Sequence, residues 1–170
     1  MKVINLFGAP GSGKSTIRAR IFSDMKIAGF KVEEVTEYAK DIVWEERFNV
    51  FQDQIYILGK QNRRLLRLQD KVDYVITDSP VLLGVCYMTP IPYFESLEQL
   101  IIAVFKSYDN INIFLNRTHE YQEYGRNHNE EEANVLSNDI KSLMIKNNIP
   151  FIEMNSSEVS LEHILPLLEK

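Results

Sequence analysis

The fold of this chain is decided by one stretch near its start, Gly8-Ala9-Pro10-Gly11-Ser12-Gly13-Lys14-Ser15. The stretch is an unbroken G-x-x-x-x-G-K-S pattern, between an apolar run at residues 3–7 and a helical pattern that begins at Lys14. Glycines let the backbone turn sharply, so that successive N–H groups point at phosphate oxygens. The start of the following helix adds the positive end of its dipole. The pattern therefore predicts a phosphate-binding loop.

Within such a loop the lysine and the serine have distinct expected roles. We expect Lys14 to reach the β- and γ-phosphates of ATP and the Ser15 hydroxyl to coordinate Mg²⁺. With no nucleotide bound, the Lys14 side chain is expected to project into solvent. The alternative is a glycine-rich turn that matches by chance, but strand, loop and helix all agree here. The predicted nucleotide-binding residues are Gly8, Ala9, Pro10, Gly11, Ser12, Gly13, Lys14, Ser15 and Thr16.

Length and composition limit the class of protein. The chain has 170 residues, 45% of them hydrophobic and 25% charged, which suits one domain over residues 1–170. Its net charge of −5 argues against a globally basic nucleic-acid binder, although a local basic patch stays open. The single Cys86 cannot form an internal disulfide, and no Cys/His cluster has zinc spacing. With no secretory signal and no apolar run of membrane-spanning length, we expect a soluble, cytoplasmic protein.

Apolar bursts alternate with helical patterns along the chain, which is typical of βαβ units. Strands are predicted at residues 3–7, 31–36, 74–78, 111–115 and 150–154. Helices are predicted at residues 14–28, 51–70, 94–106, 130–146 and 161–168, and Gly29 is expected to end the first. The predicted fold class is α/β, a three-layer P-loop NTPase fold with a five-stranded, mostly parallel sheet and helices on both faces.

Two carboxylates follow predicted strands, where ligands bind in open parallel sheets. Asp78 ends the third strand, and we expect it to hold Mg²⁺ together with Ser15. Glu37 follows the second strand, where a carboxylate could take the proton of an attacking hydroxyl. The alternatives are that Asp78 only begins a turn and that Glu37 is a solvated residue opening a helix.

A polar segment after the fourth strand, at about residues 117–129, has the character of a lid. Arg117 and Arg126 bracket it, and guanidinium groups bind phosphate oxygens without losing their charge. We expect both arginines to contact the transferred phosphoryl group. The alternative is an exposed loop whose arginines only add solubility.

Basic and aromatic residues between the second and third strands leave two further possibilities open. Five cations recur at helical spacing, Lys60, Arg63, Arg64, Arg67 and Lys71. They would either approach acceptor phosphates or a nucleic-acid backbone, or form the solvated face of an amphipathic helix. Trp44, Phe48 and Phe51 would either stack on an acceptor base or pack in the core.

The motifs exclude some nucleotide-binding proteins. A guanine-reading Asn-Lys-x-Asp is absent, and Asn116-Arg117-Thr118-His119 follows the fourth strand instead. The chain is also too short for a mechanical ATPase with a separate lid domain. A small kinase and a nucleotide-binding module without turnover remain.

The sequence resembles known P-loop kinases over residues 1 to about 155. Its phosphate loop is similar to that of adenylate- and thymidylate-type kinases. The chain also resembles bacteriophage P-loop nucleotide kinases in three segments: residues 35–40, Ile76-Thr77-Asp78-Ser79-Pro80, and residues 116–126 with 130–133. One departure is that many thymidylate and nucleoside kinases have Asp-Arg where this chain has Asp78-Ser79. An arginine acting there would have to come from elsewhere, such as Arg63 or Arg64, or be absent.

The resemblance implies an ATP- and Mg²⁺-dependent kinase of a nucleotide-type acceptor. Some kinases of this group phosphorylate 5-hydroxymethyluracil in phage DNA, which implies the hydroxymethyl group of 5-hydroxymethyluridine, in weakly bound modified DNA, as the acceptor here. A nucleoside monophosphate, a nucleoside, and a nicotinamide or other small nucleoside-like molecule are alternative acceptors. The same resemblance implies the host cell cytoplasm as the location, allows a homodimer, and involves no membrane.

Overall fold

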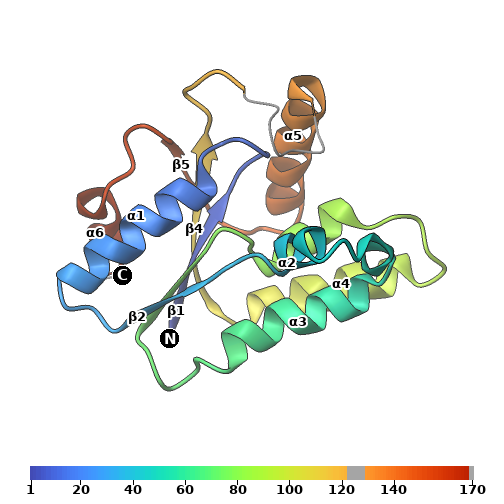
Figure 1. The fold of residues 1–170 in the computed structure, drawn as a ribbon, viewed down its shortest axis with the longest axis horizontal. Coiled ribbons are helices and arrows are strands. Elements are labelled where there is room, and N and C mark those ends of the chain that lie inside the picture. The colour runs from blue at the N-terminus through green and yellow to red at the C-terminus, as the bar shows by residue number, and fades with distance from the viewer. Residues whose placement is uncertain (122–128, 169–170) are drawn as a thin grey trace.

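The computed structural model describes residues 1–121 and 129–168 and contains a five-stranded sheet (Figure 1). The strands lie in the order β2-β3-β1-β4-β5, and every neighbouring pair is parallel. Their bounds are β1 Lys2–Phe7, β2 Val32–Val35, β3 Tyr74–Thr77, β4 Asp109–Asn116 and β5 Ile152–Asn155. The predicted five-stranded α/β fold is confirmed, and the sheet is parallel throughout.

Helices cover both faces of this sheet, which gives the predicted three layers (Figure 1). One face is covered by α1 Lys14–Ile27 and α6 Leu161–Leu168. The other is covered by α3 Gln54–Leu66, α4 Phe94–Lys106 and α5 Glu130–Lys146. Shorter pieces complete the fold: α2 Tyr38–Trp44 and two 3₁₀ helices, η1 Phe48–Gln52 and η2 Val81–Tyr87. No helix within the described ranges has the length and apolar character to cross a membrane.

The first βα unit folds as its pattern predicts. Val3 to Phe7 are buried, as expected of a central strand of a parallel sheet. On α1, Ile17, Ile21 and Met25 are buried against the sheet at helical spacing. Gly29 follows the end of α1 with φ 85°, a conformation that favours glycine. This unit places the phosphate loop, residues 8–15, at the carboxyl edge of β1.

The single helix predicted at residues 51–70 is wrong. Residues 48–52 form η1, and α3 begins only at Gln54, because the Asp53 side chain caps it by accepting a hydrogen bond of 3.0 Å from the Tyr56 N–H. The helix ends at Leu66, and Asp70 beyond it has a positive φ of 61°. Lys71 therefore lies outside the helix, so the five cations do not form one helical stripe. Three apolar side chains on α3 and α4, those of Ile55, Leu66 and Leu100, are exposed.

Candidate functional site

The phosphate loop has a backbone conformation that requires glycine. Gly8, Gly11 and Gly13 have φ values of 140°, 76° and 90°. A Cβ atom on Gly8 would lie 2.5 Å from Ser12 Oγ and 2.9 Å from the carbonyl oxygen of Leu115. Gly13 is the N-cap of α1, so the first turn of that helix opens directly onto the loop. The loop therefore has the shape and dipole of an anion site.

Lys14 does not project into solvent, contrary to expectation. Its Nζ donates hydrogen bonds to the carbonyl oxygens of Gly8 and Ala9, both at 2.8 Å. The ammonium is thus held over the phosphate loop by the loop's own backbone. A phosphate at this position would meet a cation that is already close by.

Glu37 lies beyond β2, as the N-cap residue of α2, and its side chain is not a freely solvated one. Burial raises the pKa of its carboxyl above the ordinary 4.5, and the Asp78 carboxylate adds to the rise, whereas Lys14 and Lys40 oppose it. Glu37 is therefore close enough to both Lys14 and Asp78 to feel their charges. The structure brings together the lysine of the loop and the two carboxylates predicted from the strand ends.

Asp78 is held by an arginine that the sequence patterns did not single out. Arg18 Nε lies 3.3 Å from Asp78 Oδ2, and Arg18 Nη1 lies 3.1 Å from Glu34 Oε2 on β2. The Arg18 and Asp78 side chains are only 13% and 11% exposed. The available signal was spacing, because Arg18 follows Lys14 by four residues and so shares its face of α1.

Two residues of α3 fix the turns that carry Glu37 and Asp78, and sequence reasoning missed this role. Gln61 accepts a hydrogen bond of 3.1 Å from the Tyr38 N–H and donates to the carbonyl oxygens of Thr36 and Ser79 at 3.4 and 3.1 Å. Arg64 pairs with Asp41 and donates to the Thr36 carbonyl and hydroxyl oxygens, each at 3.0 Å. Arg64 therefore supports the segment before Glu37 and does not belong to a solvated stripe.

Arg117 lies at the end of β4, beside the phosphate loop. Its Nη2 donates to Glu130 at 2.6 Å and to Asn134 at 3.3 Å, and its guanidinium lies 4.9 Å from the centre of the Tyr121 ring. It shares a small cavity of about 210 Å³ with Ala9, Pro10 and Ser12 of the loop. Arg126 and most of the predicted lid, residues 122–128, lie outside the described residues.

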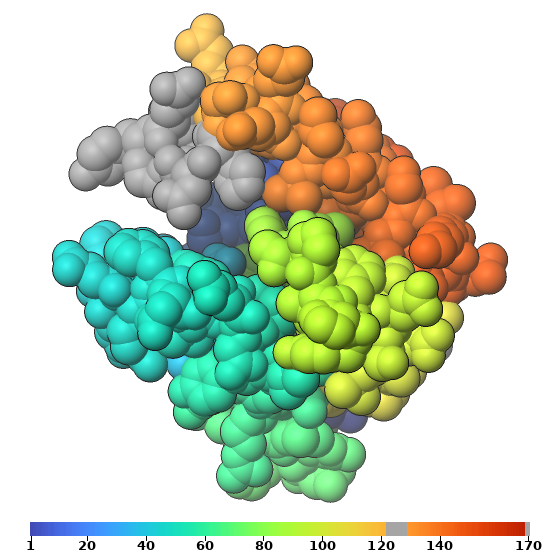
Figure 2. Space-filling model, turned by 90° about the vertical axis from the view of Figure 1, so that its right-hand side faces the viewer, coloured from blue at the N-terminus to red at the C-terminus, as the bar shows by residue number. Residues whose placement is uncertain are grey.

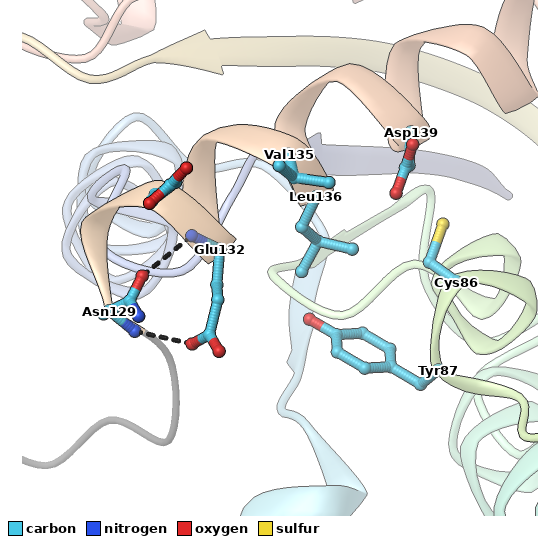
Figure 3. Close-up of a pocket in the computed structure, with 8 residues that line it drawn as sticks. Cys86, Tyr87, Asn129, Glu132, Val135, Leu136 and Asp139 are labelled. Atoms are coloured by element: carbon cyan, nitrogen blue, oxygen red, sulfur yellow. Dashed lines mark hydrogen bonds between the residues drawn. The ribbon is translucent and has the colours of Figure 1, made fainter.

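A larger cavity of about 520 Å³ opens between η2 and the first turns of α5 (Figure 3). Tyr87 points into it toward Leu136, while Val135 adds apolar surface and Asp139 a carboxylate. Burial raises the pKa of the Tyr87 phenol, and the Glu37 carboxylate raises it further, so Glu37 lies within electrostatic range of this cavity. From the side, the molecule is hollowed between these elements and the 38–55 region (Figure 2).

Cys86 also lines this cavity. Burial raises the pKa of the Cys86 thiol to about 11, so it stays protonated at neutral pH and is no nucleophile.

Asn129 and Glu132 form a reciprocal capping box at the start of α5, with both hydrogen bonds at 2.9 Å (Figure 3). Glu132 is therefore part of the helix cap.

The aromatic residues of α2 and η1 are not core residues. The Trp44 and Phe48 residues are 78% and 57% exposed, and Phe51 is half-buried. The alternative of core packing is therefore wrong for Trp44 and Phe48.

A comparison with models of known protein families identifies the family of this chain. A family model described as AAA domain matches residues 3–161, most of the chain. The chain belongs to this AAA domain family. A search of curated proteins gave no significant match.

Two solved structures are similar in fold to this AAA domain. A NadR protein in complex with NR matches with a TM-score of 0.74 and 17% identity over 99% of this chain. The chain spans 50% of the NadR chain that it matches. A deoxyadenosine kinase from M. mycoides with bound dATP matches with a TM-score of 0.59 and 20% identity over 100% of both chains. At these identities the likeness shows the fold alone, which agrees with the three-layer P-loop NTPase fold predicted from the sequence.

Proposed function

We propose that this AAA domain is a kinase that transfers the γ-phosphoryl group of ATP to a hydroxyl of a nucleoside-type acceptor. The observation that carries the proposal is the approach of Glu37 to Lys14 and Asp78 at the carboxyl edge of the sheet. A module that only binds a nucleotide needs no half-buried carboxylate beside its phosphate loop. A NadR protein bound to NR and a deoxyadenosine kinase bound to dATP, both of this fold, give the proposal further support.

Residues 8–16 would bind the triphosphate, with Lys14 at the β- and γ-phosphates. Ser15 and Asp78 suit Mg²⁺, because hydroxyl and carboxylate oxygens are hard ligands and Asp78 Oδ1 is buried with no hydrogen-bond partner among the described residues. No group of three or more His, Cys, Asp or Glu side chains in the described ranges could hold a metal by itself, so phosphate oxygens would complete the site. When bound, Mg²⁺ neutralises charge on the β- and γ-oxygens.

Glu37 would act as the general base. As the acceptor oxygen forms its bond to the γ-phosphorus, the bond from that phosphorus to the leaving ADP oxygen breaks and the hydroxyl proton moves to the Glu37 carboxylate. Its raised pKa brings the carboxylate nearer to a hydroxyl in basicity. Arg117, from its position beside Ala9 and Pro10, and Arg126 would stabilise the transferred group.

The cavity at Tyr87 supports a small acceptor. Its volume of about 520 Å³ suits a nucleoside, and its carboxylates, Glu131, Glu132 and Asp139, would repel a phosphodiester backbone. The basic residues proposed for DNA are dispersed, since Arg64 is paired with Asp41. We therefore rank a free nucleoside-type acceptor above 5-hydroxymethyluridine in phage DNA. A single kinase domain over residues 1–170, with a lid at about 117–129, is part of this proposal.

The test is a transfer assay with γ-labelled ATP and Mg²⁺. The panel contains nucleosides, nucleoside monophosphates, NR, and DNA with thymine or 5-hydroxymethyluracil, at low and moderate salt. We expect label in a nucleoside-type product with wild type and none with Lys14→Ala. Exclusive labelling of the modified DNA would reverse the ranking of acceptors. Absence of transfer to any acceptor, with ATP still bound, would favour a binding module.

A further inference from the structure

Three charged side chains from separate elements form a chain of two ion pairs. Arg18 of α1 lies between Glu34 of β2, at 3.1 Å, and Asp78 beyond β3, at 3.3 Å. Glu34 pairs in the sheet with Ile76, two residues before Asp78, so both carboxylates reach Arg18 from neighbouring strands. Arg18 is thereby ion-paired on two sides, with neither nitrogen in hydrogen-bond geometry among the described residues.

The contact with Arg18 distinguishes the two oxygens of the Asp78 carboxylate. Oδ2 faces the guanidinium, whereas Oδ1 is buried with no hydrogen-bond partner among the described residues. A buried carboxylate oxygen without a partner is costly, unless a ligand uses it. Arg18 lies three residues after Ser15 on α1. One helix therefore carries both the Ser15 hydroxyl and the guanidinium that contacts the Asp78 carboxylate.

We infer that Arg18 is a positioning residue that sets the orientation of Asp78 for the metal–nucleotide complex, with Glu34 as its anchor. This inference rests on the proposed function, because it concerns the same site. The Arg18 guanidinium spans two carboxylates with separate nitrogens, Nε and Nη1, in ion pairs that lack hydrogen-bond geometry. A lysine keeps the charge but has one point-like ammonium, so it cannot hold Asp78 and Glu34 in the same geometry.

The test uses Mn²⁺ as a probe for the metal, with a non-hydrolysable ATP analogue, and measures bound Mn²⁺ by EPR. Orienting groups of this kind typically contribute about 10- to 100-fold to metal affinity or activity. We expect Arg18→Lys to weaken Mn²⁺ binding by that order while the metal-free nucleotide binds as in wild type. Glu34→Gln should also weaken Mn²⁺ binding, by a smaller factor than Arg18→Lys does. In turnover, the Mg²⁺ concentration for half-maximal rate should rise, and saturating Mg²⁺ should restore most of kcat.

Arg20→Ala is the matched control, because Arg20 lies on the same helix, is exposed, and makes a long 3.9 Å ion pair with Asp24. It should leave Mn²⁺ binding unchanged. Wild-type Mn²⁺ affinity in folded Arg18→Lys would overturn the inference. If Arg18→Lys does not fold, an unchanged affinity in Glu34→Gln would overturn it instead. Weakened Mn²⁺ binding in a protein that transfers phosphate to no acceptor would leave the inference standing and remove the proposed function.

Discussion

Lys14 Nζ lies 2.8 Å from the carbonyl oxygen of Gly8, at the opposite end of the phosphate loop. The loop thus holds the ammonium that its own pattern provides, with Ala9 as a second acceptor. A bound triphosphate would replace two neutral carbonyl acceptors by charged oxygens, and charge-assisted hydrogen bonds are the stronger kind. We therefore expect Lys14 to contribute little to folding stability and much to phosphoryl transfer.

Lys14→Ala should lower phosphoryl transfer by at least about 100-fold, the typical effect of removing one donor from a developing charge. The fold should persist, because two hydrogen bonds to backbone carbonyls contribute only about 1–3 kcal/mol together. Transfer of labelled phosphate and thermal unfolding measure the two effects. Full activity in the variant would contradict the assignment of the phosphate loop.

Glu37→Gln should lower kcat by about 100- to 10,000-fold, the usual contribution of a general base. Glu46→Gln is a suitable control, since it makes the same change at an exposed carboxylate just beyond α2. In wild type, kcat/KM should fall as the pH drops through the raised pKa of Glu37, because the protonated carboxyl cannot accept a proton. An unchanged pH profile in Glu37→Gln would contradict the role of base.

The same substitution should stabilise the fold at neutral pH. The folded-state pKa of Glu37 lies above its ordinary 4.5, so folding favours the protonated form and the ionised carboxylate is a cost. That cost is absent below pH 4.5 and develops as the pH rises through the folded-state pKa. Glu37→Gln should therefore raise Tm at pH 7, and the gain should vanish toward pH 4. A gain independent of pH would contradict this explanation.

Arg117→Ala should lower turnover more than ATP affinity, if the guanidinium meets the phosphoryl group chiefly in the transition state. Glu130→Gln is the informative partner variant, because it loosens the 2.6 Å contact of Arg117 while keeping the guanidinium. It should retain most of the turnover. A loss of ATP affinity with no change in kcat would instead indicate a loop that only binds ATP.

Gly8→Ala should destabilise the protein by about 1–3 kcal/mol or more, since positive φ strains an alanine and its Cβ would collide with Ser12 Oγ and the Leu115 carbonyl. Gly59→Ala offers a matched comparison within α3, where a Cβ meets no atom within 4 Å. It should stabilise the fold by about 0.5–1 kcal/mol. Urea unfolding of both variants measures the difference, and equal effects would contradict the strained geometry of the loop.

Local patterns in the sequence determined much of this protein by themselves. The phosphate loop, the first βα unit and the bounds of α5 and α6 follow from glycine spacing, apolar periodicity and helix caps, which act within a few residues of chain. Asp78 and Glu37 were also predictable as site candidates, because the carboxyl ends of parallel strands meet at one edge.

Only the tertiary structure decided how these groups are held. The strand order β2-β3-β1-β4-β5 sets Val35 beside Thr77, which brings the turns of Glu37 and Asp78 together. It also places Arg18 between Glu34 and Asp78, and Gln61 between Thr36 and Ser79. Such contacts join residues far apart in the chain, and they depend on the order of strands and the packing of α1 and α3. No local periodicity encodes that order, because residues of the same type and spacing would read alike in any arrangement of the five strands.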